Sequence, residues 1–153
     1  MNTILCETGE IIVVEAETLS GAVLDGLNLH RALLQGSDLS GASFFATNLR
    51  SALLSDAVLV AANMREANLA NVNADGASLE RVELVGALLA AASFVKANLR
   101  FANLEGADIG FADFRQADIR GANMNCLRIE TAEFERAIWD STTRFPLGFT
   151  LNN

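Results

Sequence analysis

The chain has 153 residues, 51% of them hydrophobic, which is enough to bury the core of one domain. Its formal net charge of −8 argues against direct nucleic-acid binding, because phosphates attract basic surfaces. Cys6 and Cys126 have no second thiol or histidine at a metal-like spacing, which predicts unpaired, non-catalytic thiols in a reducing cytoplasm.

Residues 1–17 form the first expected unit, an N-terminal cap. The segments Ile4-Leu5-Cys6 and Ile11-Ile12-Val13-Val14 flank the turn-like Glu7-Thr8-Gly9-Glu10, a pattern that predicts two short strands around a tight turn. The opening residues lack the basic segment of a secretory signal, so we expect no export. The longest nearly apolar stretch, 85–95, is well short of the roughly 18–20 residues of a membrane-spanning helix, so we expect no membrane insertion.

Residues 18–141 carry an internal repeat with a period of five. Every fifth residue from Leu19 to Trp139 is Leu, Ile, Met, Phe or Trp, with Ala74 as the one exception among 25 positions. The residue two positions before each of these large residues is alanine in 18 of 24 units. The residue between the alanine position and the large residue is Asn or Asp in 12 units. The unit therefore reads A-(N/D)-L-x-x.

A period of five fits neither a helix nor a strand, because apolar positions repeat at about 3.6 in a helix and at about 2 in a strand. If each unit is one short extended side plus a corner, four units close a square coil, and residue k lies beneath residue k + 20. The large residue and the alanine then point inward, and alternating them fills the coil at close-packed density. We expect Asn and Asp at the corners, because their side chains bond local backbone, and glycines such as Gly21 and Gly121 where φ is positive.

This pattern resembles the pentapeptide-repeat family over residues 19–139. Ala67-Asn68-Leu69, Ala97-Asn98-Leu99, Ala102-Asn103-Leu104 and Ala107-Asp108-Ile109 match the family consensus. The resemblance implies an all-β fold, a right-handed, four-sided β-solenoid (quadrilateral β-helix). With 25 units at four per coil, it would have about six 20-residue coils.

Stacking follows from the 20-residue coil. One inner column should contain a ladder of three phenyl rings: Leu34, Leu54, Ala74, Phe94, Phe114 and Phe134. A second should read Leu29, Leu49, Leu69, Leu89, Ile109 and Ile129, with Asn28, Asn48 and Asn68 stacked outside it.

Residues 142–153 form the last expected unit, a C-terminal capping loop and tail. Phe145-Pro146-Leu147-Gly148-Phe149 brings two aromatic residues around the only proline. This segment resembles the closing loop of many family members. Because a solenoid exposes the core of its last coil, we expect the segment to fold back over it.

No pattern in the chain predicts catalysis, a cofactor or a metal site. His30 falls at an outward position, and the S-x-x-K pattern of Ser93 and Lys96 lacks its companion motifs. The nearby carboxylates Glu130, Glu133 and Glu135 are typical of a solvated face, where arginines can pair with them weakly. We therefore expect a protein that is not an enzyme and has no small-molecule substrate.

Two function classes remain open. The first is a structural or protein-interaction module that presents a rigid surface to a protein partner or to itself, with the outward Phe101 and Phe111 as the contact surface if they border one patch. The second comes from the resemblance, since some pentapeptide-repeat proteins are acidic DNA mimics that bind type II topoisomerases such as gyrase. Residues 1–17 hold four glutamates and no basic residue, so the rest of the chain is only weakly acidic, which disfavours the mimic. Uninterrupted arrays of this size also look like those common in cyanobacteria.

Overall fold

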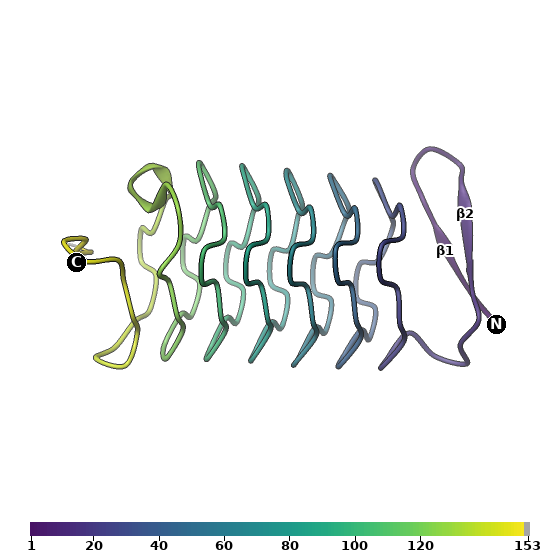
Figure 1. The fold of residues 1–153 in the computed structure, drawn as a ribbon, viewed down its shortest axis with the longest axis horizontal. Helices are drawn as coiled ribbons and strands as arrows, with labels where there is room; N and C mark the ends of the chain where they lie inside the picture. The colour runs from purple at the N-terminus through teal and green to yellow at the C-terminus, as the bar shows by residue number, and fades with distance from the viewer. Residues whose placement is uncertain (152–153) are drawn as a thin grey trace.

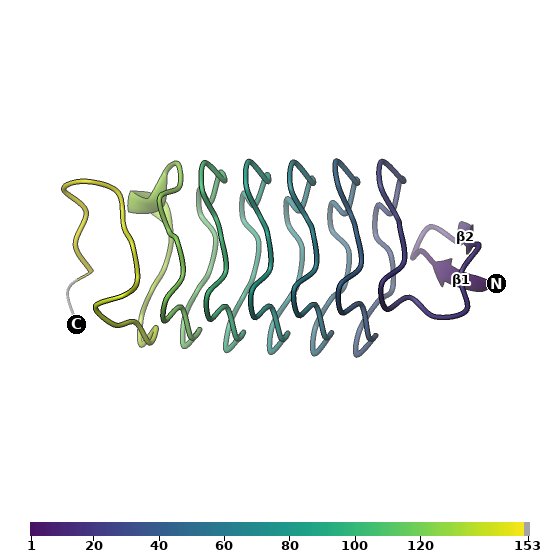
Figure 2. The same ribbon diagram turned by 60° about the horizontal axis from the view of Figure 1, so that its bottom comes forward.

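The computed structural model describes residues 1–151 as a rod of stacked square coils, preceded by a hairpin and followed by an irregular segment (Figures 1 and 2). The regular elements are the strands β1 (Asn2–Leu5) and β2 (Ile11–Val14) and the 3-10 helix η1 (Ile129–Thr131). None of the described residues belongs to a helix long and apolar enough to cross a membrane.

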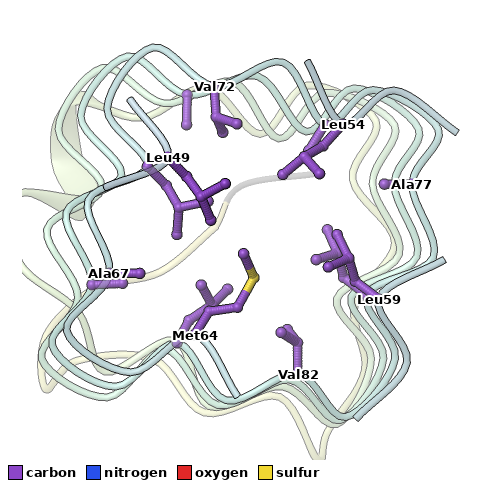
Figure 3. Packing of buried hydrophobic residues seen from close by; sticks show 14 of the residues in the cluster. Leu49, Leu54, Leu59, Met64, Ala67, Val72, Ala77 and Val82 are labelled. Atoms are coloured by element: carbon purple, nitrogen blue, oxygen red, sulfur yellow. The ribbon is translucent and has the colours of Figure 1, made fainter. Parts of the chain in front are cut away.

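Successive coils lie in register, with residue k beside residue k + 20. Parallel single-residue bridges join Val23 to Ser43 and continue at the same spacing up to Asn103 and Asn123. Viewed along the rod, Leu49, Leu54 and Leu59 lie on successive sides of one four-sided coil (Figure 3). The expected 20-residue repeat and the four sides are therefore present.

The core is formed by two residues of each repeat unit, the one at the alanine position and the large residue two positions later. Every residue of the expected column that begins at Leu29 and ends at Ile129 is at most 4% exposed. The phenyl ladder is also present, because the ring centroids of Phe94 and Phe114 are 5.1 Å apart and those of Phe114 and Phe134 are 5.2 Å apart. Alanine or a similarly small residue between the large ones leaves room for them (Figure 3).

Four of the five backbone amides in a unit have backbone partners. In the unit that begins at Ala62, the Ala62 N–H closes the preceding corner onto a carbonyl at 3.1 Å, and the Asn63 N–H donates to the preceding coil at 2.9 Å. The N–H groups of Met64 and Glu66 donate to the following coil at 2.8 and 3.0 Å. The stack therefore acts as a continuous ladder of hydrogen bonds along the rod.

The consensus Asn or Asp supplies an acceptor for the fifth amide. The Arg65 N–H donates to Oδ1 of Asn63 at 3.3 Å. In the same way, the N–H of the residue two positions later donates to Oδ1 of each of the following residues: Asp38, Asn48, Asn63, Asn68, Asn73, Asn98, Asn103, Asp108, Asp113, Asp118 and Asn123. At Asn28, Oδ1 instead accepts from Nδ2 of Asn48 at 2.7 Å, within the expected asparagine stack.

The expectation that Asn and Asp occupy the corners is wrong in position. They lie in the middle of a side, at the residue that bridges to the next coil, and only their side chains reach towards the corner. The corner residue with positive φ comes three positions later. It is a glycine at all the expected places, with φ of 68° at Gly21 and 70° at Gly121.

The sequence predicts a continuous register up to Trp139, and this prediction is wrong. Asp108 bridges to Leu127 instead of Arg128, whereas Asp113 and Asp118 bridge to Glu133 and Ile138 at the regular spacing again. Cys126 is buried where the repeat placed Leu127, and Leu127 is 58% exposed. The unit after Met124 is therefore one residue shorter than the others. The residue with left-handed φ is Arg128, immediately before η1, and this extra residue restores the 20-residue spacing in the units that follow.

The terminal segments contact the solenoid. The hairpin of β1 and β2 is antiparallel, as predicted, and the Leu33 N–H donates to the carbonyl of Leu5 at 2.8 Å. At the other end the Phe149 ring lies 6.3 Å from that of Phe134 and 5.6 Å from that of Phe145. The predicted closing segment, 142–153, includes residues 152 and 153, which lie outside the described residues.

Candidate interaction surface

The residues that the sequence offered for catalysis, His30 and the Ser93–Lys96 pair, lie apart from one another in the described structure. Nδ1–H of His30 donates to the backbone carbonyl of Arg50 at 2.8 Å, so this nitrogen is engaged in stacking one coil on the next. Oγ of Ser93 donates to Asp75 of the preceding coil, while Lys96 is an exposed corner residue with φ of 60°. The hydroxyl of Ser93 is therefore bonded to the carboxylate of Asp75 and not to the amine of Lys96.

The carboxylates near the C-terminus are separate surface groups. Glu133 lies 3.4 Å from the guanidinium of Arg115, and Glu135 lies 3.7 Å from that of Arg136, as the sequence suggested. Within residues 1–151, no three His, Cys, Asp or Glu side chains are arranged to hold a metal ion.

Both thiols are free and buried. Burial raises the pKa of the Cys126 thiol to about 12, and its Sγ–H donates to the carbonyl of Met124. Burial, with the Glu10 carboxylate adding to it, also raises the pKa of Cys6. Because the thiolate is the nucleophile, neither thiol is suited to catalysis in this setting.

Phe101 is exposed but fixed in place. It is a corner residue with φ of 58°, and its ring is flanked by the guanidinium carbons of Arg81 and Arg100, each 5.4 Å from the ring centroid. A Cβ atom on Gly121 would lie only 2.5 Å from a ring carbon, so a glycine in the next coil is required to seat this ring. The ring contacts also engage the Arg100 side chain, whose buried Nε has no hydrogen-bond partner.

Phe111 is more exposed than Phe101, at 68% against 46%. The two residues are ten positions apart, which is half of a 20-residue coil, so they lie at opposite corners. The side chains of Leu49 and Leu59, also ten apart, show this relation in Figure 3. Phe101 and Phe111 therefore do not border one patch, and the predicted pair does not form a single contact surface.

The four faces differ in charge. We define the Ala90 face by its outward residues, which are Asn28, Asn48, Asn68, Leu88, Asp108 and Leu127; His30, Arg50, Ala70, Ala90, Gly110 and Glu130; and the corner residues Arg31, Ser51, Asn71, Ala91, Phe111, Arg128 and Thr131. It carries three arginines and two carboxylates. Each of the other three faces, taken with the same two outward positions of each unit and the corner that follows them, carries more acidic than basic side chains. The Ala90 face is therefore the least acidic side of an acidic protein.

The middle of the Ala90 face is apolar and low in relief. Leu88 is 49% exposed beside the small Ala90 and the exposed Ala91, and Phe111 rises at the edge. Next to them the guanidinium of Arg128 lies against Gly110, where a side chain would collide with it, and its Nε donates to Asp108 at 2.6 Å. This ion pair extends the flat surface without leaving an uncompensated charge.

The ends of the rod also expose apolar side chains. The outer face of the hairpin presents Leu5, Ile11 and Val13, which are 48–60% exposed, beside a run of glutamates. At the C-terminal end an open depression is lined by Phe134, Trp139 and Phe149.

The Ala90 face is not among the surfaces predicted from the sequence. The 20-residue coil assigns the residues directly before and after each large core residue to one of four faces, so this face could have been predicted from the sequence. Sorting them would also have placed Phe101 and Phe111 at opposite corners.

Comparison with known proteins agrees with this geometry. The model of the pentapeptide repeats family matches in eight copies, over residues 18–50, 42–81, 83–121 and 97–136. A pentapeptide repeat protein of the Arabidopsis thaliana thylakoid lumen is 31% identical, with a TM-score of 0.58, over 65% of this chain and 66% of that one, slightly less than two thirds of its length. One from Nostoc PCC 7120 is 32% identical, with a TM-score of 0.52, over 61% of this chain and 77% of that one.

No curated protein matches the chain significantly. These two of the matching structures are a plant and a cyanobacterial protein, in keeping with the expectation from the uninterrupted array. On the eight matched repeats and the stacked coils that they form, the chain belongs to the pentapeptide repeat family.

Proposed function

We propose that this protein is a non-enzymatic interaction module that presents fixed columns of side chains to a protein partner or to a second copy of itself. The observation that carries the proposal is the ladder of backbone hydrogen bonds that joins residues about 20 apart, because it fixes the backbone from which each column of outward side chains projects. Preorganised surfaces bind at a lower cost in entropy than flexible ones.

The architecture behind this proposal is a right-handed solenoid of about six coils with shielded ends. Residues 1–17 would cap the first coil, which is supported by the hydrogen bonds of Leu5 and Glu7 to it. Residues 142–153 would cap the last coil, which is supported by the packing of Phe149 on Phe134. Residues 18–141 would then be the part that binds.

The proposal is tested by placing one charge on each face in turn. Val60, Val85, Ala90 and Val95 occupy the same outward phase on the four different sides, so replacing each with arginine gives a matched set. A partner that docks on one rigid face, captured on the immobilised protein, should be lost with one of the four variants and kept with the other three. Binding that is equally lost, or equally kept, in all four would contradict recognition by a fixed face.

The alternative is an acidic DNA mimic that occupies a type II topoisomerase such as gyrase. The net charge of −8 favours it. The distribution of the charge does not, because arginines neutralise acidic side chains towards the C-terminus, as at Arg115, Arg120 and Arg128, each of which pairs with an aspartate.

We also propose a reducing compartment, the cytoplasm, because Cys6 and Cys126 are both free thiols. The thylakoid-lumen location belongs to the Arabidopsis protein. Fractionation of the native cell with an antibody to this chain would decide between the two.

A further inference from the structure

We propose that a second copy of this chain docks on the Ala90 face, with the two rods antiparallel and the two-fold axis crossing the interface at Ala90. This inference rests on the proposed interaction role and names its partner. A homodimer of this kind is isologous, so the same patch must be complementary to itself.

The centre of the Ala90 face meets the steric requirement. At Gly110 the guanidinium of Arg128 fills the place of a side chain. Before it along the rod, Ala70 and Ala90 follow one another, as the hydrogen bond from Asn71 to the carbonyl of Ala90 shows. Such small residues allow two flat parallel sheets to approach closely, and flat sheets are commonly stabilised by stacking on one another. Leu88 and Phe111, 49% and 68% exposed, supply apolar area that water otherwise covers.

The charges meet the requirement of self-complementarity. A two-fold axis that lies across the rods sets each column of one copy against the same column of the other, in reverse order. With Ala90 on the axis, Arg50, two coils before it, faces Glu130 of the second copy, two coils after it. Both side chains are exposed, and neither has an ion-pair partner among residues 1–151.

The neighbouring column is compatible with the same axis. Leu88 would meet Leu88 of the second copy. Asn68, one coil before it, would face Asp108 of the second copy, and its side-chain amide can donate to that carboxylate.

Other arrangements bring like charges together. A parallel pair of rods would set Arg50 against Arg50 and Glu130 against Glu130. Each of the other three faces carries an excess of acidic side chains, so pairing it with itself would add repulsion. The outer face of the hairpin has the same difficulty, because residues 1–17 hold four glutamates and no basic side chain.

Charge reversal tests the pairing directly. Sedimentation equilibrium of the full chain should give a mass of twice 16.3 kDa at high-micromolar concentration. Arg50→Glu alone and Glu130→Arg alone should each raise the dissociation constant by about tenfold or more, because each places two like-charged contacts in the symmetric interface. The double variant Arg50→Glu/Glu130→Arg should recover most of the wild-type affinity, since it exchanges the two charges.

Lys96→Glu is the matched control. Lys96 is an exposed cation without an ion-pair partner in the described chain, and it lies at a corner that does not border the Ala90 face. It should leave the dissociation constant unchanged, while Ala90→Arg, at the axis, should give monomers with an unchanged melting temperature.

Three results would overturn the dimer: a wild-type monomer throughout the concentration range, single reversals that dimerise as the wild type does, or a double variant as weak as the single ones. A monomer that still captures another protein on one face would leave the proposed interaction role standing. The two proposals can therefore fail separately.

Discussion

At the scale of single residues, the position before each large core residue has a specific task. Asn and Asp both offer an Oδ1 acceptor to the amide two residues on, which has no backbone carbonyl within reach. Where serine replaces them at Ser43 and Ser93, the carboxylates of Asp25 and Asp75 in the preceding coil accept the same amide instead, at 2.9 and 3.0 Å. The consensus is thus explained by hydrogen-bond satisfaction.

Two of these aspartates make the stability of the protein depend on pH. The hydrogen bond from Arg115 lowers the pKa of Asp113, and that from Arg120 lowers the pKa of Asp118. A carboxyl whose pKa is lower in the folded state stabilises the fold above its unfolded pKa of about 3.9, and this contribution is lost as the pH falls through the folded pKa. Asp113→Asn/Asp118→Asn keeps both Oδ1 acceptors.

We expect this double variant to lose at most about 1 kcal/mol at pH 7, because exposed ion pairs contribute little. Its melting temperature should then fall less than that of the wild type between pH 5 and strongly acidic solution. Thermal unfolding followed by circular dichroism checks this. Parallel losses in the two proteins would show that the two carboxyls do not have lowered pKa values.

The two exposed phenylalanines should respond differently to glycine. Both have left-handed φ, which costs an L-residue roughly 1–2 kcal/mol. Phe111→Gly should leave the melting temperature unchanged or slightly raised, because little packing is lost. Phe101→Gly should lower it, because the ring contacts Gly121, Arg81 and Arg100. Equal melting temperatures would contradict the assigned contacts of Phe101.

At the scale of elements, the shortened unit before η1 is the main irregularity of the solenoid. Cys126 replaces Leu127 in the core, and its small side chain fits the inward phase that alanine usually fills. Leu127 and Arg128 then lie on the Ala90 face. The irregularity thus contributes to the outer surface as well as to the core.

Thiol reactivity reports on this element. With its pKa raised to about 12 and its side chain buried, Cys126 should not react with an aromatic disulfide reagent in the native protein. Both thiols should react at once in denaturant. Rapid labelling of Cys126 in the folded chain would mean that it points outward and that the register continues as in the repeat.

The sequence predicts the columns of the core well because the pattern with a period of five is repeated so many times. It does not predict the register break, because Leu127 and Ile129 still satisfy the spacing of the repeat. Nor does it reveal the acceptors at Asp25 and Asp75, since these bonds link positions about one coil apart in the sequence that only the coil brings together. The glycine under Phe101 is hidden for the same reason.

At the scale of the whole molecule, charge distribution matters more than net charge. The glutamates of residues 1–17 account for half of the net charge of −8, while the Ala90 face carries more arginines than carboxylates. A DNA mimic needs acidic columns that continue along the rod. This rod has paired charges over most of its length.

We therefore expect no effect on a type II topoisomerase. In a gyrase supercoiling assay, micromolar protein should neither inhibit the enzyme nor protect it from a quinolone. Arg50→Glu, which makes the least acidic face acidic, is a useful comparison. Inhibition by the wild-type chain would favour the DNA-mimic alternative.

The stacking of each residue k on residue k + 20 is the claim on which all of these surfaces depend, and disulfide formation measures it directly. In a Cys6→Ala/Cys126→Ala background, Val58→Cys/Ser78→Cys places two thiols at bridged positions of adjacent coils, at the spacing of about 4.8 Å between paired strands. Leu53→Cys/Val58→Cys places two thiols only one repeat unit apart in the sequence but on different sides of one coil. Under mild oxidation of the native protein, we predict a complete intramolecular disulfide in the first pair and free thiols in the second; a disulfide in the second pair and none in the first would contradict the coil.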